Sequence, residues 1–196
     1  MTPRLACILV LCIASRAHGD THATLSNSTG LVEDHRELVE ELAIRDALLD
    51  RLTIWHVKEG RPVYVQHCRQ APQGCEARVS AYAAYFVDAG NEYGIDPWLL
   101  AAMALKESSL NPAAIGARGE HGVLQLHPQG QAAKRARMCE GGDCTAAHVN
   151  SAAKHLAECI RVCGDVRKGL GRYNAGRCID SVYARMVLRE RERMAR

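Results

Sequence analysis

The chain has 196 residues, of which 47% are hydrophobic, and this is enough for one ordinary domain with its own core. Its 25 basic and 22 acidic residues leave a formal net charge of only +3 at pH 7. So small an excess does not indicate a nucleic-acid-binding protein, although it is compatible with an anionic polymer as ligand. The hydrophobic content also argues against disorder throughout the chain.

Residues 1–19 have the features of a secretory signal peptide. Arg4 precedes an apolar stretch from Leu5 to Ala14, and Ala17-His18-Gly19 fits a cleavage site of small residues. The apolar stretch is too short to span a bilayer, and no later segment approaches the roughly 20 apolar residues of a membrane-spanning helix. We therefore expect a protein exported to the periplasm or the extracellular space, without stable insertion in the membrane.

The cysteines predict disulfide bonds, because nine cysteines less the two in the predicted signal peptide leave seven in an exported chain. Cys68 with Cys75 and Cys139 with Cys144 are predicted local pairs, since each pair brackets a short loop that contains Gly or Pro. Zinc is the alternative for the second pair, but its spacing fits no standard zinc finger. No metal site is therefore predicted.

A third disulfide is expected at Cys178, towards the end of the chain. Its partner is either Cys163 or Cys159, and the sequence leaves this choice open. The odd cysteine then stays free or pairs with another molecule.

The N-terminal region after the signal is predicted as a linker, a helix and a connection. Residues 20–30 are polar and lack periodicity, so they are interpreted as a linker. From Leu31 to about Trp55, apolar residues recur at steps of three and four, which predicts an amphipathic helix. The expected role of this helix is packing on the main body, and the alternative is binding of a protein partner or dimerisation. Residues 31–75 thus form an N-terminal helix and connection.

Residues 76–196 are predicted to form the main domain, and this domain is predicted to be mainly α-helical. Asp96 and Pro97 mark a helix start, because Asp caps helices and Pro is favoured at the first helical position. Strand patterns are almost absent, apart from a short extended piece expected at Val123–Leu126 in an irregular middle segment. The predicted helices cover Glu76–Asn91, Pro97–Ser108, Thr145–Cys163, Val166–Tyr173 and Ile179–Met194.

One carboxylate, Glu107, lies near the end of the predicted helix that starts at Pro97. Leu99, Met103 and Glu107 are separated by four residues each, so the carboxylate continues an apolar stripe. Pro112 ends the helix soon after Glu107 and leaves the acid near the negative end of the helix dipole. Desolvation and this dipole both raise the pKa of a carboxyl group.

A carboxyl group that is protonated near neutral pH can act as the general acid in cleavage of a glycosidic bond. The periodicity by itself equally favours a simpler interpretation of Glu107. In that alternative it is an exposed glutamate at a helix end, paired with Arg118 or Lys106.

Two further segments carry candidate site residues. Gly116, Gly119 and Gly122 let the backbone turn tightly, but the strand and the Lys-Ser/Thr of a phosphate-binding loop are missing. Tyr173-Asn174-Ala175-Gly176 ends a predicted helix, where Asn and Gly are ordinary stop residues. Tyr173 is therefore either a core aromatic residue or a cleft residue delivered from a second helix end.

Taken together, the segments resemble the lysozyme-like soluble lytic transglycosylases. The resemblance covers roughly residues 94–184 and depends on motifs in a fixed order and spacing. It implies a small, mostly helical lysozyme-like fold that cleaves peptidoglycan glycan strands between N-acetylmuramic acid and N-acetylglucosamine without metal or cofactor. The motifs are Glu107-Ser108, Asn111-Pro112, Gly119-x-x-Gly122-x-x-Gln125 with Pro128, Asn150 with His155-Leu156, and Tyr173-Asn174-Ala175-Gly176.

The resemblance implies that Glu107 is the single catalytic acid and base. It would protonate the glycosidic oxygen and then take a proton from the muramoyl C6 hydroxyl as that hydroxyl attacks C1, which gives a 1,6-anhydro product. The substrate-binding set implied by the same motifs contains Ser108, Gly116, Gln125, Tyr173 and Asn174.

The chain departs from the family pattern at two positions. Gly116 stands where the family usually has a serine, and His127 stands where it often has methionine. These departures keep two alternatives open. One is a hydrolytic lysozyme-like muramidase with Glu120 or Asp143 as second carboxyl group, and the other is a non-catalytic peptidoglycan-binding protein.

Overall fold

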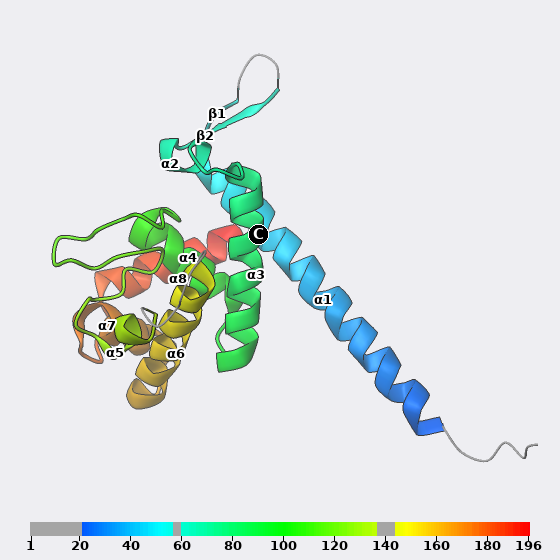
Figure 1. Cartoon of the computed structure of the whole chain (residues 1–196). Helices are drawn as coiled ribbons and strands as arrows, with labels where there is room; N and C mark the ends of the chain where they lie inside the picture. Colours follow the sequence, from blue (N-terminus) through cyan, green and yellow to red (C-terminus); the bar gives the residue numbers. More distant parts are fainter. Residues whose placement is uncertain (1–20, 57–59, 137–143) are drawn as a thin grey trace, which may run out of the picture. The chain divides into compact units, whose positions relative to one another are not determined.

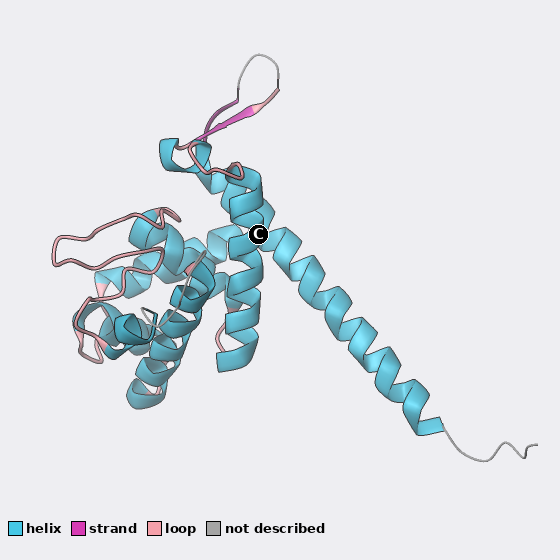
Figure 2. Cartoon of the chain, viewed as in Figure 1, coloured by secondary structure: helices cyan, strands magenta, loops and turns pink. Residues whose placement is uncertain are grey.

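The computed structural model of the chain describes residues 21–56, 60–136 and 144–196. The predicted signal peptide lies outside the described residues. The chain divides into two compact units, residues 1–35 and 36–196. Helices dominate the described residues, which confirms the mainly α prediction (Figure 2).

The first helix, α1 (Thr21–Leu52), begins earlier than predicted. The expected linker is helical from Thr21 onwards. The prediction failed because a lack of apolar periodicity excludes a helix face that packs on a core, but does not exclude a helix. In the second unit, the packing role is confirmed for the last turns, where Ile44, Leu48 and Leu52 are buried. Leu38 and Leu42 are exposed instead. A partner-binding role for this helix stays a prediction.

A short hairpin replaces the predicted end of this helix. The strands β1 (Thr53–His56) and β2 (Pro62–Tyr64) pair antiparallel, although a helix was expected to about Trp55. The β-branched pair Thr53-Ile54 favours a strand directly after Leu52. Sequence periodicity missed the hairpin because its strands are too short to display alternation.

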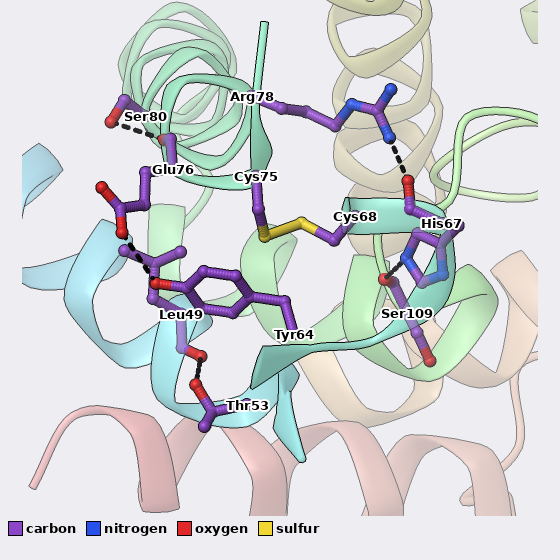
Figure 3. The surroundings of a disulfide bond; sticks show 10 residues. All are labelled: Leu49, Thr53, Tyr64, His67, Cys68, Cys75, Glu76, Arg78, Ser80 and Ser109. Carbon is purple, nitrogen blue, oxygen red and sulfur yellow. Dashed lines mark hydrogen bonds between the residues drawn. A yellow bond between two sulfur atoms is a disulfide. The ribbon is translucent and has the colours of Figure 1, made fainter. Parts of the chain in front are cut away.

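The connection that follows contains the short helix α2 (Gln66–Arg69) and the first predicted disulfide. The bond Cys68–Cys75 is confirmed (Figure 3). Arg78 donates to the carbonyl of His67 at 3.0 Å, and Nε2 of His67 donates to the carbonyl of Ser109 at 2.9 Å (Figure 3). The disulfide-linked segment therefore supports the residue that caps the helix carrying Glu107.

The helix α4 (Pro97–Ser108) has its central residues in the core. Leu100, Met103 and Ala104 of α4 are fully buried, and α4 packs against α3 and α8. α6 packs against α3, α5 and α7, and α7 also contacts α8 (Figure 1). Apart from the short α5, the sequence predicted these helices, with ends that differ by up to three residues. They are α3 (Cys75–Tyr93), α4 (Pro97–Ser108), α5 (Gln131–Ala136), α6 (Thr145–Cys163), α7 (Val166–Ala175) and α8 (Val182–Met194).

The start of α4 follows the predicted capping chemistry. Oδ1 of Asp96 accepts a hydrogen bond from the backbone N–H of Trp98 at 3.0 Å, and Pro97 occupies the first turn. Nε of Arg191 donates to the other carboxylate oxygen of Asp96 at 2.6 Å. One aspartate thus caps α4 and ties it to α8.

The remaining cysteines resolve the open choice of partner. Cys163 is bonded to Cys178, whereas Cys159 is buried and free. Cys144 is disulfide-bonded, and its predicted partner Cys139 lies outside the described residues. No helix within the described ranges has the length and apolar character needed to cross a membrane.

Candidate active site

A cleft of about 1100 Å³ lies where α4, the loop between α4 and α5, α6 and α7 meet. Glu107 comes from the end of α4, Glu120 and Gln125 come from the loop, and Tyr173 and Asn174 come from α7. Several helices and one loop therefore contribute to one concave site, which is the usual form of a small-molecule or glycan site. The cleft also includes Lys154, His155, Glu158 and Arg161 from α6.

Glu107 occupies the predicted position on the apolar stripe of α4. Leu99 and Met103 of the same stripe are buried, and Glu107 itself is half-buried. The pKa of Glu107 is raised to about 6: burial is the largest cause, the hydroxyl of Tyr183 acts in the lowering direction, and the charge of Glu120 acts in the raising direction. The predicted rise in pKa is confirmed, with desolvation as its main cause.

The alternative of a Glu107 paired with a cation is wrong. Arg118 pairs with Glu120 at 3.0 Å, and Lys106 pairs with Glu190 at 2.6 Å. Arg118 and Lys106 therefore form ion pairs with other carboxylates and not with Glu107.

Tyr183 is a site residue that sequence reasoning missed. Its hydroxyl is buried and makes no hydrogen bond of standard geometry to any residue that the structure describes, yet it is near enough to Glu107 to lower the pKa of that carboxyl group. Burial and the charge of Glu107 raise the pKa of Tyr183 well above its ordinary value. The available signal was spacing, because Tyr183, Val187 and Glu190 share one face of α8 at steps of four and three.

The middle loop is a tight turn and not the expected extended piece. The backbones of His121 and Leu126 exchange hydrogen bonds of 3.2 and 3.1 Å across the turn, and Gln125 has a φ of 46°. Val123, Leu124 and Leu126 are nevertheless buried, so the apolar side chains of the turn enter the core. Four residues are too few to separate this pattern from a strand.

Two helices fix this turn by its carbonyl groups. The hydroxyl of Ser108 on α4 donates to the carbonyl of Val123 at 2.8 Å, and the hydroxyl of Tyr173 on α7 donates to the carbonyl of Leu124 at 2.8 Å. Gln125, which follows directly, is thereby held at the cleft.

The predicted substrate-binding residues fall into two groups. Gln125, Tyr173 and Asn174 line the cleft, whereas Ser108 and Gly116 are not among its lining residues. Nε2 of Gln125 donates to two backbone carbonyls of the same loop, at 3.1 and 2.9 Å. Its amide nitrogen therefore serves the loop, and its carbonyl oxygen is the atom left for a ligand.

Glu120 is a second carboxylate in the cleft. Its Oε2 accepts from the backbone N–H of Arg118 at 2.9 Å, and its Oε1 accepts from Nε of Arg118 at 3.0 Å. Hydrogen bonds from its own backbone N–H and from Arg118 lower the pKa of Glu120. Asp143, the other second carboxyl considered from the sequence, lies outside the described residues.

The site combines an acid with a raised pKa, Glu107, and a carboxylate with a lowered pKa, Glu120. Among the residues that the structure describes, no group of three His, Cys, Asp or Glu side chains could hold a metal ion. The available groups can transfer a proton and stabilise positive charge.

A comparison with protein families matches the same region of the chain that carries the sequence motifs. The family model described as the transglycosylase SLT domain matches residues 84–187, just over half of the chain. The matched range contains Glu107, Gln125, Tyr173 and also Tyr183. No solved structure matches the chain.

Proposed function

This chain belongs to the transglycosylase SLT domain family, and we propose that it is a lytic transglycosylase that uses Glu107 as its single acid and base. The family acts on peptidoglycan by cleavage of glycosidic bonds, and its lysozyme-like fold agrees with the helical architecture. The proposed bond is the one between N-acetylmuramic acid and N-acetylglucosamine. One observation carries the proposal: the half-buried Glu107 lines the cleft with a pKa of about 6, and within the described residues no ion pair joins it to a cation.

The proposed reaction begins with a proton on Glu107. Glu107 gives this proton to the glycosidic oxygen, the bond from that oxygen to C1 breaks, and positive charge develops on the muramoyl ring. The C6 hydroxyl oxygen of the same ring then bonds to C1 and its proton passes to Glu107. The product carries a 1,6-anhydro ring, no water is consumed, and Glu107 is protonated again for the next cycle.

The cleft geometry supports this assignment of roles. A pKa near 6 keeps a substantial fraction of Glu107 protonated close to neutral pH, which an ordinary carboxyl group would not be. Gln125, Tyr173 and Asn174 line the same cavity and are proposed to position the sugars. The reaction needs no metal or cofactor, because one carboxyl group carries the proton in both directions.

An exported location fits this proposal. Peptidoglycan lies outside the cytoplasmic membrane, and the disulfides Cys68–Cys75 and Cys163–Cys178 are typical of proteins in oxidising compartments. We therefore propose the periplasm or the extracellular space as the site of action. Protein partners of the N-terminal helix stay a prediction.

Mass spectrometry of released muropeptides tests the function. Purified protein is incubated with cell-wall sacculi beside Glu107→Gln, with Glu192→Gln as control because Glu192 is exposed and does not line the cleft. Anhydro-ended products from the wild type and the control, but not from Glu107→Gln, are expected. Reducing ends, which are heavier by one water, would indicate a hydrolase. Co-sedimentation with sacculi without any release would indicate a binding protein.

A hydrolytic muramidase is the second candidate function. It is favoured by one observation, the carboxylate of Glu120 in the same cleft as Glu107. Hydrolases of this type commonly use two carboxyl groups, of which one activates water or attacks the sugar.

A further inference from the structure

The space above Gly116 is filled by the side chains of two cleft residues. A Cβ atom at this position would lie 2.7 Å from Oε1 of Gln125 and 2.7 Å from Oε2 of Glu120. Gly116 is not among the residues with positive φ, so the backbone does not require glycine here. The glycine leaves room for a carboxylate and an amide oxygen to meet at the cleft.

The loop holds Glu120 firmly in this place. The backbone N–H of Gly116 donates to the carbonyl of Glu120 at 2.7 Å, and the N–H of Gly119 donates to the carbonyl of Gly116 at 3.1 Å, which closes the turn. Both carboxylate oxygens of Glu120 accept hydrogen bonds from Arg118. The side chain of Glu120 is 15% exposed, whereas that of Arg118 is 72% exposed. The carboxylate therefore lies at the cleft and its cation reaches solvent.

We propose that Glu120 is a further catalytic residue, whose carboxylate, held over Gly116 by Arg118, contacts the sugar in the cleft and stabilises the positive charge that develops at C1. This inference rests on the proposed function. A fixed negative charge beside a developing cation lowers the barrier without reorganising during the reaction. Glu120 makes no covalent bond and keeps its charge throughout.

The same contacts argue against Glu120 as the base that activates water. Each of its oxygens is already hydrogen-bonded to Arg118, and donors to a carboxylate make it a weaker base. Its charge also acts on Glu107, because it favours the protonated form of that acid. The two carboxyl groups thus have different roles in one cleft.

Other groups also face Glu107 and must be considered in any pH-dependent test. Tyr183 approaches from α8, Tyr173 interacts with Glu107 from α7, and Glu120 acts from the loop. Both phenols have pKa values raised by burial, so they stay neutral between pH 4 and pH 8. A change in the alkaline limb after substitution of Glu120 therefore reports on Glu120 and not on these two phenols.

The first test compares Glu120→Gln with the wild type and with the exposed control Glu192→Gln, on soluble glycan fragments. We expect kcat of Glu120→Gln to fall by roughly tenfold to hundredfold, with little change in KM and with anhydro products retained. The alkaline limb of the rate profile should move to lower pH, because Glu107 loses a negative neighbour. Glu120→Asp should recover part of kcat.

The second test displaces the carboxylate without removing it. Gly116→Ser places atoms where the ends of Glu120 and Gln125 lie, and Ala113→Ser is the control at an exposed position of the same loop. Gly116→Ser should lower kcat, and the double variant with Glu120→Gln should be hardly worse than Glu120→Gln alone. Thermal unfolding curves establish that each variant is folded.

The outcomes separate the two proposals. Wild-type kcat and an unmoved alkaline limb in Glu120→Gln would overturn the role of Glu120 and leave the transglycosylase proposal intact. Selective loss of reducing-end products in that variant would identify Glu120 as the base for water, and would also overturn the inference. No release by the wild type would overturn the proposed function, and the role of Glu120 with it.

Discussion

Glu107 and Glu190 are carboxylates on two helices that pack together, α4 and α8, and both lie on inward faces. Glu190 is 1% exposed and pairs with Nη2 of Arg51 at 2.7 Å and Nζ of Lys106 at 2.6 Å, and Nη1 of Arg193 lies 4.0 Å from its Oε2. Burial raises the pKa of Glu190, but Lys106 and Arg51 lower it by more. Glu107 is less buried and its pKa is raised by desolvation, because no cation in the described part of the chain pairs with it. The paired cations, and not the degree of burial, therefore explain why the pKa of Glu190 is lowered and that of Glu107 is raised.

Lys106 connects the two carboxylates. It precedes Glu107 in the sequence, but neighbouring side chains on a helix point in different directions. Its ammonium group therefore reaches Glu190 on α8 and not the cleft. The cation next to Glu107 in the sequence is therefore paired with the other carboxylate.

The largest expected effect follows from Glu107→Gln, which removes the proton donor and keeps the size of the side chain. General acid–base catalysis contributes about 10² to 10⁴ in rate, so we expect at least a hundredfold loss of muropeptide release. Initial rates with sacculi measure this, and the melting temperature controls for folding. A variant with a tenth of wild-type activity or more would mean that another group supplies the proton.

The next effect is on stability and falls on the other carboxylate. Glu190→Gln leaves Arg51 and Lys106 without their common anion. Removal of one partner from a buried pair costs about 3–5 kcal/mol, and the partly exposed cations can recover some hydration, so we expect a loss of about 2–3 kcal/mol. Urea unfolding measures the change. Glu158→Gln, which breaks an exposed pair with Arg161, should cost less than about 1 kcal/mol. An equal loss of unfolding free energy in Glu190→Gln and Glu158→Gln would show that the buried ion pair of Glu190 stabilises the protein no more than the exposed pair of Glu158.

The pH dependence of stability should have opposite signs at the two carboxylates. The pKa of Glu107 is raised from 4.5 to about 6, so its contribution is fully present below the unfolded pKa and is lost as the pH rises through 6. Glu107→Gln should therefore exceed the wild type by about 2 kcal/mol at pH 8 and match it near pH 4. The lowered pKa of Glu190 gives stability above the unfolded pKa that is lost as the pH falls through the folded pKa.

Urea titrations at pH 4, 6 and 8 test both signs. A constant difference between Glu107→Gln and the wild type over this range would show that Glu107 is not desolvated. A Glu190→Gln deficit that grows on acidification would contradict its pairing with Lys106 and Arg51.

The smallest effect is expected from Tyr183→Phe. The hydroxyl of Tyr183 lowers the pKa of Glu107, so its removal should raise that pKa. The alkaline limb of the rate profile should move to higher pH by the same amount. Tyr64→Phe is the matched control, because its hydroxyl donates to Glu76 outside the cleft. A limb that moves to lower pH would show that Tyr183 favours the protonated acid.

Local signals in the sequence predicted much of the fold. Asp96-Pro97 placed the start of α4, the stripe of Leu99, Met103 and Glu107 placed the acid on an inward face, and short loops placed the bond Cys68–Cys75. Each of these features depends on residues within one or two turns, where spacing fixes geometry. This is why they could be predicted from a single chain.

The electrostatics of the site depend on residues far apart in the sequence. Arg51 and Lys106 meet at Glu190, and Tyr183 approaches Glu107 from another helix. The spacing of apolar residues does not indicate whether Glu107 or Glu190 pairs with these cations. The distance from Gly116 to Glu120 and Gln125 is likewise a property of the folded turn. Sequence spacing identified the acid but not the groups that set its pKa.

The buried Cys159 has a consequence for the order of events in oxidative folding. In an unfolded chain, Cys159 and Cys163 are almost equally near to Cys178 along the sequence, so loop entropy hardly distinguishes them. In the folded chain, Cys159 is covered and burial raises the pKa of its thiol, which leaves little reactive thiolate. Packing of α6 therefore withdraws Cys159 from thiol–disulfide exchange and leaves Cys163 as the partner of Cys178.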